Sequence, residues 1–156
     1  ILLQGGGTVT VDVLIGADGI NSQVRKCALG TPARYLGVNA IFGMSTLRHP
    51  LLQGHVFQTN DGGNRLFCMP FQEGVTFWQL SFEDSLEGVR ETNASPQKLI
   101  EAALARCGRW HEPVPEMIAS TELSQVSGHG VFDHEPVAPR AQCSAAESVK
   151  DGVCAR

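Results

Sequence analysis

Apolar residues recur at every second position, or in short runs, through most of the first half of the chain, which is the pattern of β-strands. Residues 1–4 and 8–15 flank a triple glycine at positions 5–7, and glycine supplies the positive φ angles of a tight hairpin. The second segment alternates valine with polar residues and is uniformly apolar over residues 13–15. We therefore expect an opening β-hairpin whose second strand ends buried on both faces.

A short helix is expected next. Asn21 and Ser22 are candidate N-caps, apolar residues follow at helical spacing, and Gly30 and Pro32 are stop signals. The pattern predicts a strand, a tight turn and a helix in succession.

Four segments rich in β-formers follow at residues 36–47, 55–60, 65–69 and 75–82, separated by turn-forming residues. They predict a meander of antiparallel strands. Aromatic side chains in strands usually belong to a core, and a pocket along one face is the alternative. The aromatic residues in question are Phe67, Phe71, Phe77, Trp78 and Phe82.

One amphipathic helix is expected to cover this sheet. Ser95 is a suitable cap, Pro96 suits the first helical position, and apolar residues recur at helical spacing as far as Cys107, before Gly108. A last short strand is expected at residues 130–133.

Composition and charge narrow the class of protein. The 156 residues are 42% hydrophobic and 18% charged, which is typical of a globular domain. A net charge of −4 gives no basic face for nucleic acid, and no apolar run is long enough for a membrane span. We expect a soluble, cytoplasmic protein whose partner is a small-molecule substrate and which has no stable membrane span.

Cysteine and histidine spacings indicate neither a disulfide framework nor a metal site. The five cysteines include no C-x-x-C pair, and the five histidines lack metal-ligand spacing. No Ser, His and Asp arrangement can be argued from spacing, so no catalytic residue is assigned.

The turn between the first apolar segment and the first helix carries the candidate chemistry. Glycines let the backbone approach a ligand, and a carboxylate can accept hydrogen bonds from ribose hydroxyls or from the amides of the turn itself. An ordinary Asp-Gly turn with an ordinary cap is the simpler alternative. The candidate cofactor-binding residues are Gly16, Ala17, Asp18, Gly19, Ser22 and Arg25.

Residues 12–25 resemble the DG fingerprint of the flavoprotein aromatic hydroxylases, the family of salicylate and para-hydroxybenzoate hydroxylases. The similarity continues in order and spacing to about residue 140. Its further segments are Tyr35-Leu36-Gly37, residues 65–70, Trp110 with Pro113, residues 118–121 and residues 131–137.

This resemblance implies a FAD-dependent monooxygenase in which NAD(P)H reduces the flavin and one atom of O2 enters the substrate. It implies that Asp18 helps to hold the FAD ribose and lines the pyrophosphate path of the nicotinamide cofactor. Ser22 and Arg25 would organise the turn, and residues 35–82 would belong to the sheet that roofs the substrate over the flavin.

The expected fold class is α/β, mixed α+β in this chain, with part of a Rossmann-like FAD/NAD(P)-binding domain before an antiparallel substrate domain. Residues 1–34 would end the FAD-binding domain, 35–129 would form the substrate-side sheet with one covering helix, and 130–140 would return toward the FAD domain. Residues 141–156 would form a disordered or aberrant tail.

The chain is expected to be a fragment, because the family's G-x-G-x-x-G loop and Gly-Asp motif are absent from it. A frameshifted or mis-spliced reading after about Arg140 would explain the missing Gly-Asp motif. The isolated fragment is expected to bind FAD poorly and to be inactive.

The reaction is expected to be hydroxylation or epoxidation of a small, aromatic organic substrate. The alternatives are a flavin-dependent reductase or halogenase, and a non-catalytic remnant or small-ligand-binding module of the same fold.

Overall fold

A computed structural model describes residues 1–3, 6–136 and 154–155. The chain forms two compact units: unit 1 consists of residues 1–34 and 132–156, and unit 2 of residues 35–131. The tail predicted at residues 141–156 lies outside the described residues, except for 154–155.

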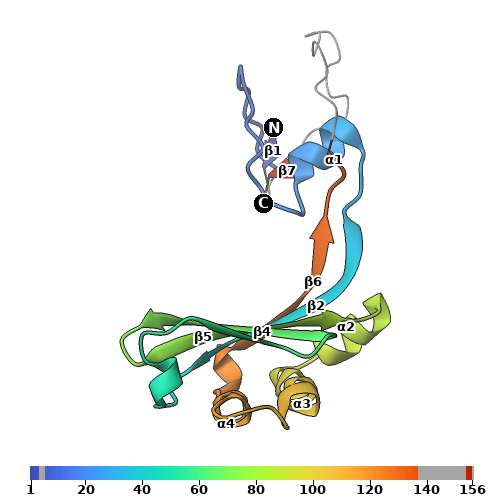
Figure 1. Ribbon diagram of the computed structural model, residues 1–156. Helices are drawn as coiled ribbons and strands as arrows, with labels where there is room; N and C mark the ends of the chain where they lie inside the picture. The colour runs from blue at the N-terminus through green and yellow to red at the C-terminus, as the bar shows by residue number, and fades with distance from the viewer. Residues whose placement is uncertain (4–5, 137–153, 156) are drawn as a thin grey trace. The chain divides into compact units, whose positions relative to one another are not determined.

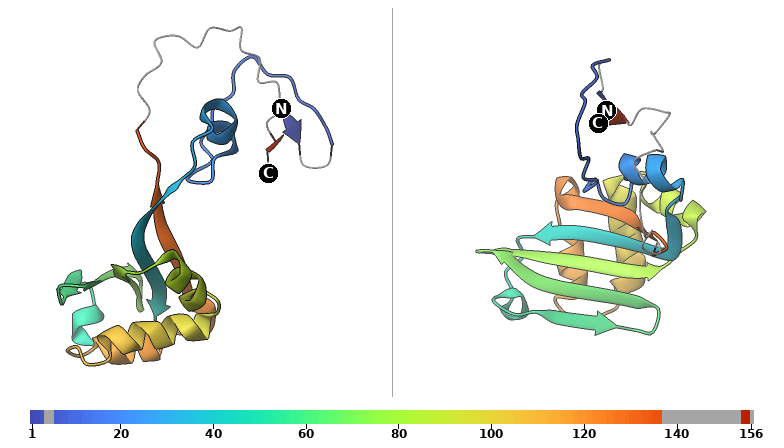
Figure 2. Two further views of the ribbon diagram at one scale, coloured as in Figure 1. Left: turned by 90° about the vertical axis from the view of Figure 1, so that its right-hand side faces the viewer. Right: turned by 90° about the horizontal axis from the view of Figure 1, so that it is seen from above.

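Unit 2 is built on a five-stranded sheet with the strand order β3-β4-β5-β2-β6 (Figure 2, right). Antiparallel pairing joins β2 to β5, β3 to β4 and β4 to β5, so the predicted antiparallel pairing is confirmed. Only β3, β4 and β5 form a meander, however, because β2 pairs with β5 and not with β3. The last strand begins several residues before the predicted position. The strands are β2 (Arg34–Ser45), β3 (Phe57–Asn60), β4 (Asn64–Gln72), β5 (Val75–Glu83) and β6 (Val126–Asp133).

Helices cover one face of this sheet (Figure 1). The predicted helix is α3 (Pro96–Cys107), where the Ser95 hydroxyl accepts a hydrogen bond from the Lys98 amide. Two further helices, α2 (Leu86–Thr92) and α4 (Val114–Ala119), were not predicted. Helix α2 has seven residues and buries only Val89. A helical period of apolar residues cannot be recognised in the sequence of so short an element with one buried position. Single 3₁₀ turns lie at Pro50–Leu52 and Leu123–Gln125.

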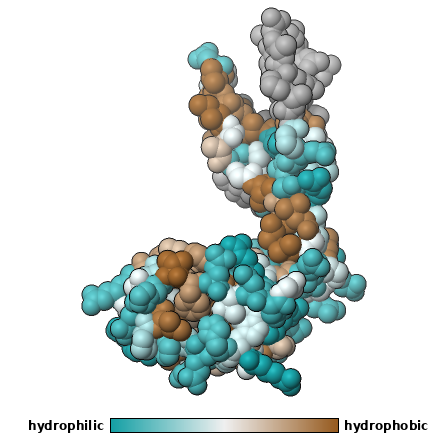
Figure 3. Space-filling view, in the orientation of Figure 1, coloured by the Kyte–Doolittle hydropathy of each residue, from teal (hydrophilic) through white to brown (hydrophobic). Residues whose placement is uncertain are grey.

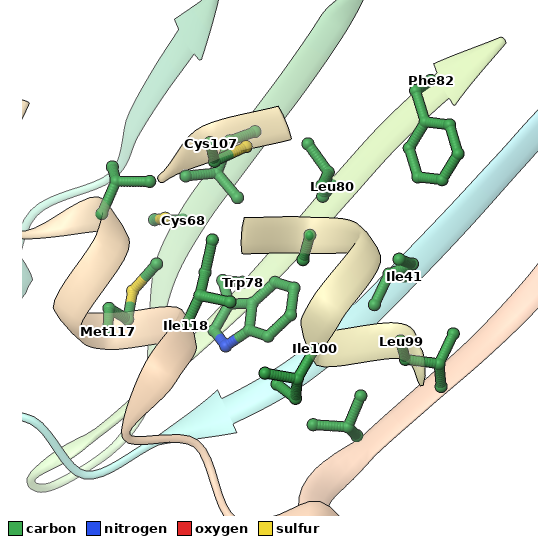
Figure 4. Packing of buried hydrophobic residues seen from close by; sticks show 14 of the residues in the cluster. Ile41, Cys68, Trp78, Leu80, Phe82, Leu99, Ile100, Cys107, Met117 and Ile118 are labelled. Carbon is green, nitrogen blue, oxygen red and sulfur yellow. The ribbon is translucent and has the colours of Figure 1, made fainter. Parts of the chain in front are cut away.

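The core of unit 2 lies between the sheet and these helices. Every second residue of β5 is buried on the helix-covered face, from Thr76 to Phe82. Trp78 is at its centre and is fully buried, among side chains of α3, α4 and the neighbouring strands (Figure 4). The fully buried side chains around it include Ile41, Leu66, Leu80, Met117 and Ile118.

The aromatic residues of the strands do not line a single face. Trp78 and Phe82 enter the core, whereas Phe77 lies on the opposite face and stacks on Phe42 with ring centroids 6.1 Å apart. Phe71 is 60% exposed. Adjacent strand residues point to opposite faces, so the alternative of one aromatic pocket is wrong.

The opening hairpin of unit 1 is shorter than predicted. Backbone hydrogen bonds join Ile1 and Val9 in both directions, at 2.7 and 2.9 Å, and the Leu3 amide donates to Gly7. Strand β1 (Leu2–Leu3) pairs in parallel with β7 (Cys154–Ala155).

Residues 10–15 form no strand, and their apolar side chains are exposed, by 76% for Val13 and 84% for Ile15. The prediction of a strand buried on both faces is therefore wrong for this chain. A strand needs hydrogen-bonded neighbours, and no described residue pairs with this segment. The brown surface of this segment is visible in Figure 3.

Candidate functional site

The predicted turn leads into helix α1 (Gln23–Leu29). Of the two candidate caps, Ser22 takes the position, and its hydroxyl accepts a hydrogen bond from the Arg25 amide at 2.9 Å. Gly30 ends the helix with φ +64°, as the stop signal indicated.

Asp18 closes the rest of the helix N-terminus. Its Oδ2 accepts hydrogen bonds from the Gln23 amide at 2.7 Å and the Val24 amide at 3.4 Å, while the Lys26 amide donates to the Ser22 carbonyl. The four amides that begin an α-helix without partners are thus all engaged by the turn itself. Of the two partners open to Asp18, ribose hydroxyls or the amides of the turn, the structure has the amides.

These contacts favour the ionised carboxylate. The hydroxyl of Ser22 contributes most, and the backbone amides of Gln23 and Val24 add to it, so the pKa of Asp18 lies below its ordinary value. Because the side chain is exposed, the carboxylate stays accessible to a ligand donor.

The two glycines of the turn have different reasons to be glycine. A Cβ on Gly16 would lie 2.8 Å from the Cβ of Val24, so this glycine lets the turn pack against α1. Gly19 has φ +72° and nothing within 4 Å of a built Cβ, so it is required by backbone conformation.

A cavity of about 650 Å³ brings the predicted site residues together. Among the six candidates, Gly16, Asp18, Gly19, Ser22 and Arg25 line it, and Ala17 does not. Its other lining residues are Ile20, Val24, Leu29 and His134.

Sequence reasoning gave His134 no role, yet it is the only lining residue from beyond α1 in the described part of the chain. Its Nε2 lies 2.8 Å from the carbonyl oxygen of Ile20. Residues 131–137 belonged to the family resemblance, but a contact across 114 positions leaves no local pattern in a sequence.

The residue before His134 is held by an ion pair. Arg34 donates from Nε to Asp133 Oδ1 at 3.0 Å and from Nη2 to Oδ2 at 2.8 Å. These hydrogen bonds from Arg34 lower the pKa of Asp133.

A second cavity, of about 220 Å³, lies on the face of the sheet opposite the helices, and it is lined by Arg65, Phe67, Gln79 and Ser81. The Nε of Arg65 donates to Gln58 at 2.9 Å, and the amide nitrogen of Gln79 donates to the Ser81 hydroxyl at 3.0 Å. One cation, two polar groups and one aromatic ring therefore meet at one place on this face.

Replacing Asp18 by alanine should free the first amides of α1. We expect hydrogen exchange of the Gln23 and Val24 amides to accelerate in D18A, measured by NMR, with little change in D12A because Asp12 makes no hydrogen bond to the described residues. In the wild type, the pKa of Asp18 is lower in the folded chain than in the unfolded chain. The stabilisation of α1 by the Asp18 carboxylate is therefore complete above the ordinary Asp pKa of ~3.9, and it is lost as the pH falls through the lower folded-state pKa. Unchanged exchange in D18A would contradict this assignment.

The described residues offer neither a cluster of metal ligands nor a helix that could span a membrane. Within residues 1–3, 6–136 and 154–155, no group of three or more His, Cys, Asp or Glu side chains could hold a metal ion. No described helix has both the length and the apolar character that a membrane crossing needs.

Comparison of the chain with known proteins finds similarity to a monooxygenase and to an epoxidase. The chain is 28% identical over 138 residues to the aurachin C monooxygenase/isomerase of Stigmatella aurantiaca, covering 88% of this chain and 35% of the relative. It is 24% identical over 147 residues to the chloroplastic zeaxanthin epoxidase of Solanum lycopersicum, covering 87% of this chain and 20% of the relative. No family model matches the chain.

The fold has solved relatives as well. The HpxO protein of Klebsiella pneumoniae, crystallised with FAD and uric acid, matches with a TM-score of 0.69 and 25% identity over 85% of this chain and 34% of that one. The mixed α+β fold is thus that of part of a FAD-binding monooxygenase, as the resemblance implied.

The homologues of this chain are FAD-dependent monooxygenases. None of these matches is a salicylate or para-hydroxybenzoate hydroxylase, so the narrower resemblance to that subfamily stays a prediction. The chain spans about a third of the length of the first relative and of HpxO.

Proposed function

We propose that this chain is part of a FAD-dependent monooxygenase that uses NAD(P)H and O2 to hydroxylate or epoxidise a small organic molecule. The observation that carries the proposal is the cavity in which Asp18, Ser22 and Arg25 meet at the end of an apolar segment. In this proposal residues 1–34 belong to the FAD-binding part and residues 35–129 to the substrate-side part.

The chemistry of this cavity suits part of FAD. The exposed carboxylate of Asp18 can accept a hydrogen bond from a ribose or ribityl hydroxyl, and the Arg25 guanidinium can donate to a phosphate oxygen. Gly16, Gly19 and Ser22 would complete the contact surface, and Ala17 would belong to the same turn. The cavity volume, about 650 Å³, lies within the usual range of ligand and cofactor sites.

The engaged amides of α1 refine this assignment. Since Asp18 and Ser22 already satisfy them, a phosphate has no free helix terminus to bind here. Arg25 and the exposed carboxylate of Asp18 are therefore the groups that we assign to the cofactor.

When bound, FAD supplies the redox chemistry: it accepts electrons from NAD(P)H and delivers them to O2. The protein residues bind and orient. The open face of the sheet supports a substrate site, because Phe67 can pack on an organic ring while Arg65 and Gln79 donate hydrogen bonds to its polar groups. A substrate of aromatic character fits this combination.

A titration of the isotope-labelled chain with FAD tests the cofactor assignment. We expect saturable shifts of the Gly16, Gly19 and Arg25 amide signals, and weak affinity, with a Kd of roughly 0.1–1 mM, because the chain carries only part of the relatives' length. R25Q should weaken binding further, whereas R90Q, on the exposed helix α2, should not. Equal shifts throughout the sheet, or none with millimolar FAD, would argue against the proposal.

Activity requires a different measurement. A longer polypeptide that contains this chain should oxidise NAD(P)H in the presence of substrate and place one atom of O2 in the product. Turnover without O2 would instead favour a flavin-dependent reductase.

The cavity on the open face of the sheet favours a second candidate function, a small-ligand-binding module of the same fold. Binding of an aromatic ligand to the open face in the absence of FAD would support that candidate.

A further inference from the structure

His134 is held against the turn that carries Asp18. It lies directly after β6, its side chain is half-buried, and its Nε2 is 2.8 Å from the Ile20 carbonyl oxygen. All the other lining residues of the cavity lie between Gly16 and Leu29, within one continuous stretch of chain.

The partner fixes the chemistry of the imidazole. A carbonyl oxygen only accepts hydrogen bonds, so Nε2 must carry the hydrogen. The neutral ring then has a bare acceptor at Nδ1, which is buried and makes no hydrogen bond to any residue that the structure describes. A flipped ring would lose the only hydrogen bond that His134 makes there, so one orientation and one tautomer are favoured.

The contacted carbonyl occupies a sensitive position. Gly19, with φ +72°, precedes Ile20, and the Ser22 amide donates to the Gly19 carbonyl at 3.1 Å. The peptide after Ile20 therefore lies between the glycine that reverses the chain and the serine that caps α1. The orientation of this peptide therefore sets the position of the Gln23 amide relative to the Asp18 carboxylate.

The support behind His134 is also anchored. Asp133 is bound by Arg34 through two hydrogen bonds of 3.0 and 2.8 Å. The Nη1 of Arg34 lies 3.6 Å from Glu135 Oε1, on the other side of His134 in sequence. Paired hydrogen bonds of this kind restrict orientation as well as distance, so the backbone at residue 133 is a firm base for the imidazole.

We infer that His134 is a positioning residue of the cofactor cavity: its Nε2–H holds the Ile20 carbonyl and so keeps Asp18 and Ser22 in place to receive the ligand. The role in cofactor binding rests on the proposed function, whereas the role in ordering the turn does not. The cavity thus depends on a segment that the chain supplies only after completing β6.

Two amide replacements separate the ring nitrogens. The side-chain NH2 of glutamine can reach the place of Nε2, whereas that of asparagine reaches only the place of Nδ1. If the Nε2–H bond positions the turn, H134Q should keep the wild-type amide exchange and FAD affinity. H134N and H134A should show faster exchange and weaker FAD binding. H55Q is the matched control, because His55 is exposed and does not line the cavity.

The free protein gives the first readout. Long-range nitrogen–proton spectra of the wild type should show the Nε2–H tautomer of His134. Hydrogen exchange of the Ser22 and Gln23 amides should be about tenfold faster in H134A and H134N, the effect of losing one hydrogen bond, and unchanged in H134Q. Both tryptophans, Trp78 and Trp110, lie in unit 2, so unchanged thermal unfolding by tryptophan fluorescence would show that the variants remain folded there.

The second readout is the FAD titration followed by amide shifts. We expect about a tenfold higher Kd for H134A and H134N, and a Kd within about twofold of wild type for H134Q. Wild-type exchange in H134A, equal rescue by asparagine and glutamine, or an Nδ1–H tautomer would overturn the inference. If the wild type shows no FAD shifts while exchange follows the expected order, the positioning role stands and the cofactor assignment fails.

Discussion

Replacing Trp78 by alanine should destabilise unit 2 more than any other single truncation, by about 3–5 kcal/mol. The indole is fully buried, and its Nε1 donates to the Thr121 hydroxyl at 3.0 Å, which in turn donates to the Met117 carbonyl at 2.7 Å. The truncation removes the packing of the ring, leaves a cavity between sheet and helices, and takes a donor from a buried hydroxyl. Urea unfolding followed by circular dichroism measures the loss.

Two variants isolate these contributions. W78F keeps a ring and loses the donor, so it should cost less than W78A. F71A removes an aromatic side chain from the same sheet, but Phe71 is 60% exposed, so the change should stay within about 0.5 kcal/mol. A loss below about 1 kcal/mol in W78A would mean that the indole is not the centre of the core.

The strands of unit 2 were predictable because buried and less buried residues alternate along much of their length, and this alternation can be recognised within a few residues of sequence. Thr76, Trp78, Leu80 and Phe82 alternate with less buried residues, and this period of two is visible in the sequence. Helix α3 was predictable for the same reason, since Ser95 and Pro96 mark its start. Helix α4 was not, because Pro113 and Pro115 point to an irregular connection, although proline is tolerated in the first turn of a helix.

The segment at residues 10–15 shows where sequence patterns stop being sufficient. Its apolar residues do predict a buried strand, but burial needs neighbours, and the described residues supply none. The apolar pattern predicts that a segment is suited to burial in a sheet. It does not tell whether the strands that would cover the segment are present.

The candidate site divides in the same way. The caps and glycines of residues 16–30 were predictable, because each acts on amides within a few residues of itself. The binding role of Asp18 remains a prediction, while its use as a helix cap is a geometric observation. His134 was missed, because its partner Ile20 is far away in sequence and no residue type signals such a contact.

Gly43 should be nearly as intolerant of substitution as Trp78, because the two residues are paired across β2 and β5. A Cβ on Gly43 would clash with the Cε2 and Cζ2 atoms of the indole. The ring cannot move away without breaking its hydrogen bond to Thr121, so we expect G43A to cost about 1–3 kcal/mol. Chemical denaturation gives this value directly. Gly63, with nothing within 4 Å of a built Cβ, is the matched control, and G63A should change stability by less than about 0.5 kcal/mol.

The contact between the two residues can be tested by a double-mutant cycle. In a W78L background the indole is absent, so the added methyl of G43A meets open space and should cost little or even stabilise the protein. The double variant should therefore be more stable than the sum of the single changes predicts, by about 0.5–3 kcal/mol. Strict additivity would show that the cost of G43A arises from the strand backbone. A favourable coupling would show instead that glycine occupies this position because the indole of Trp78 lies over it.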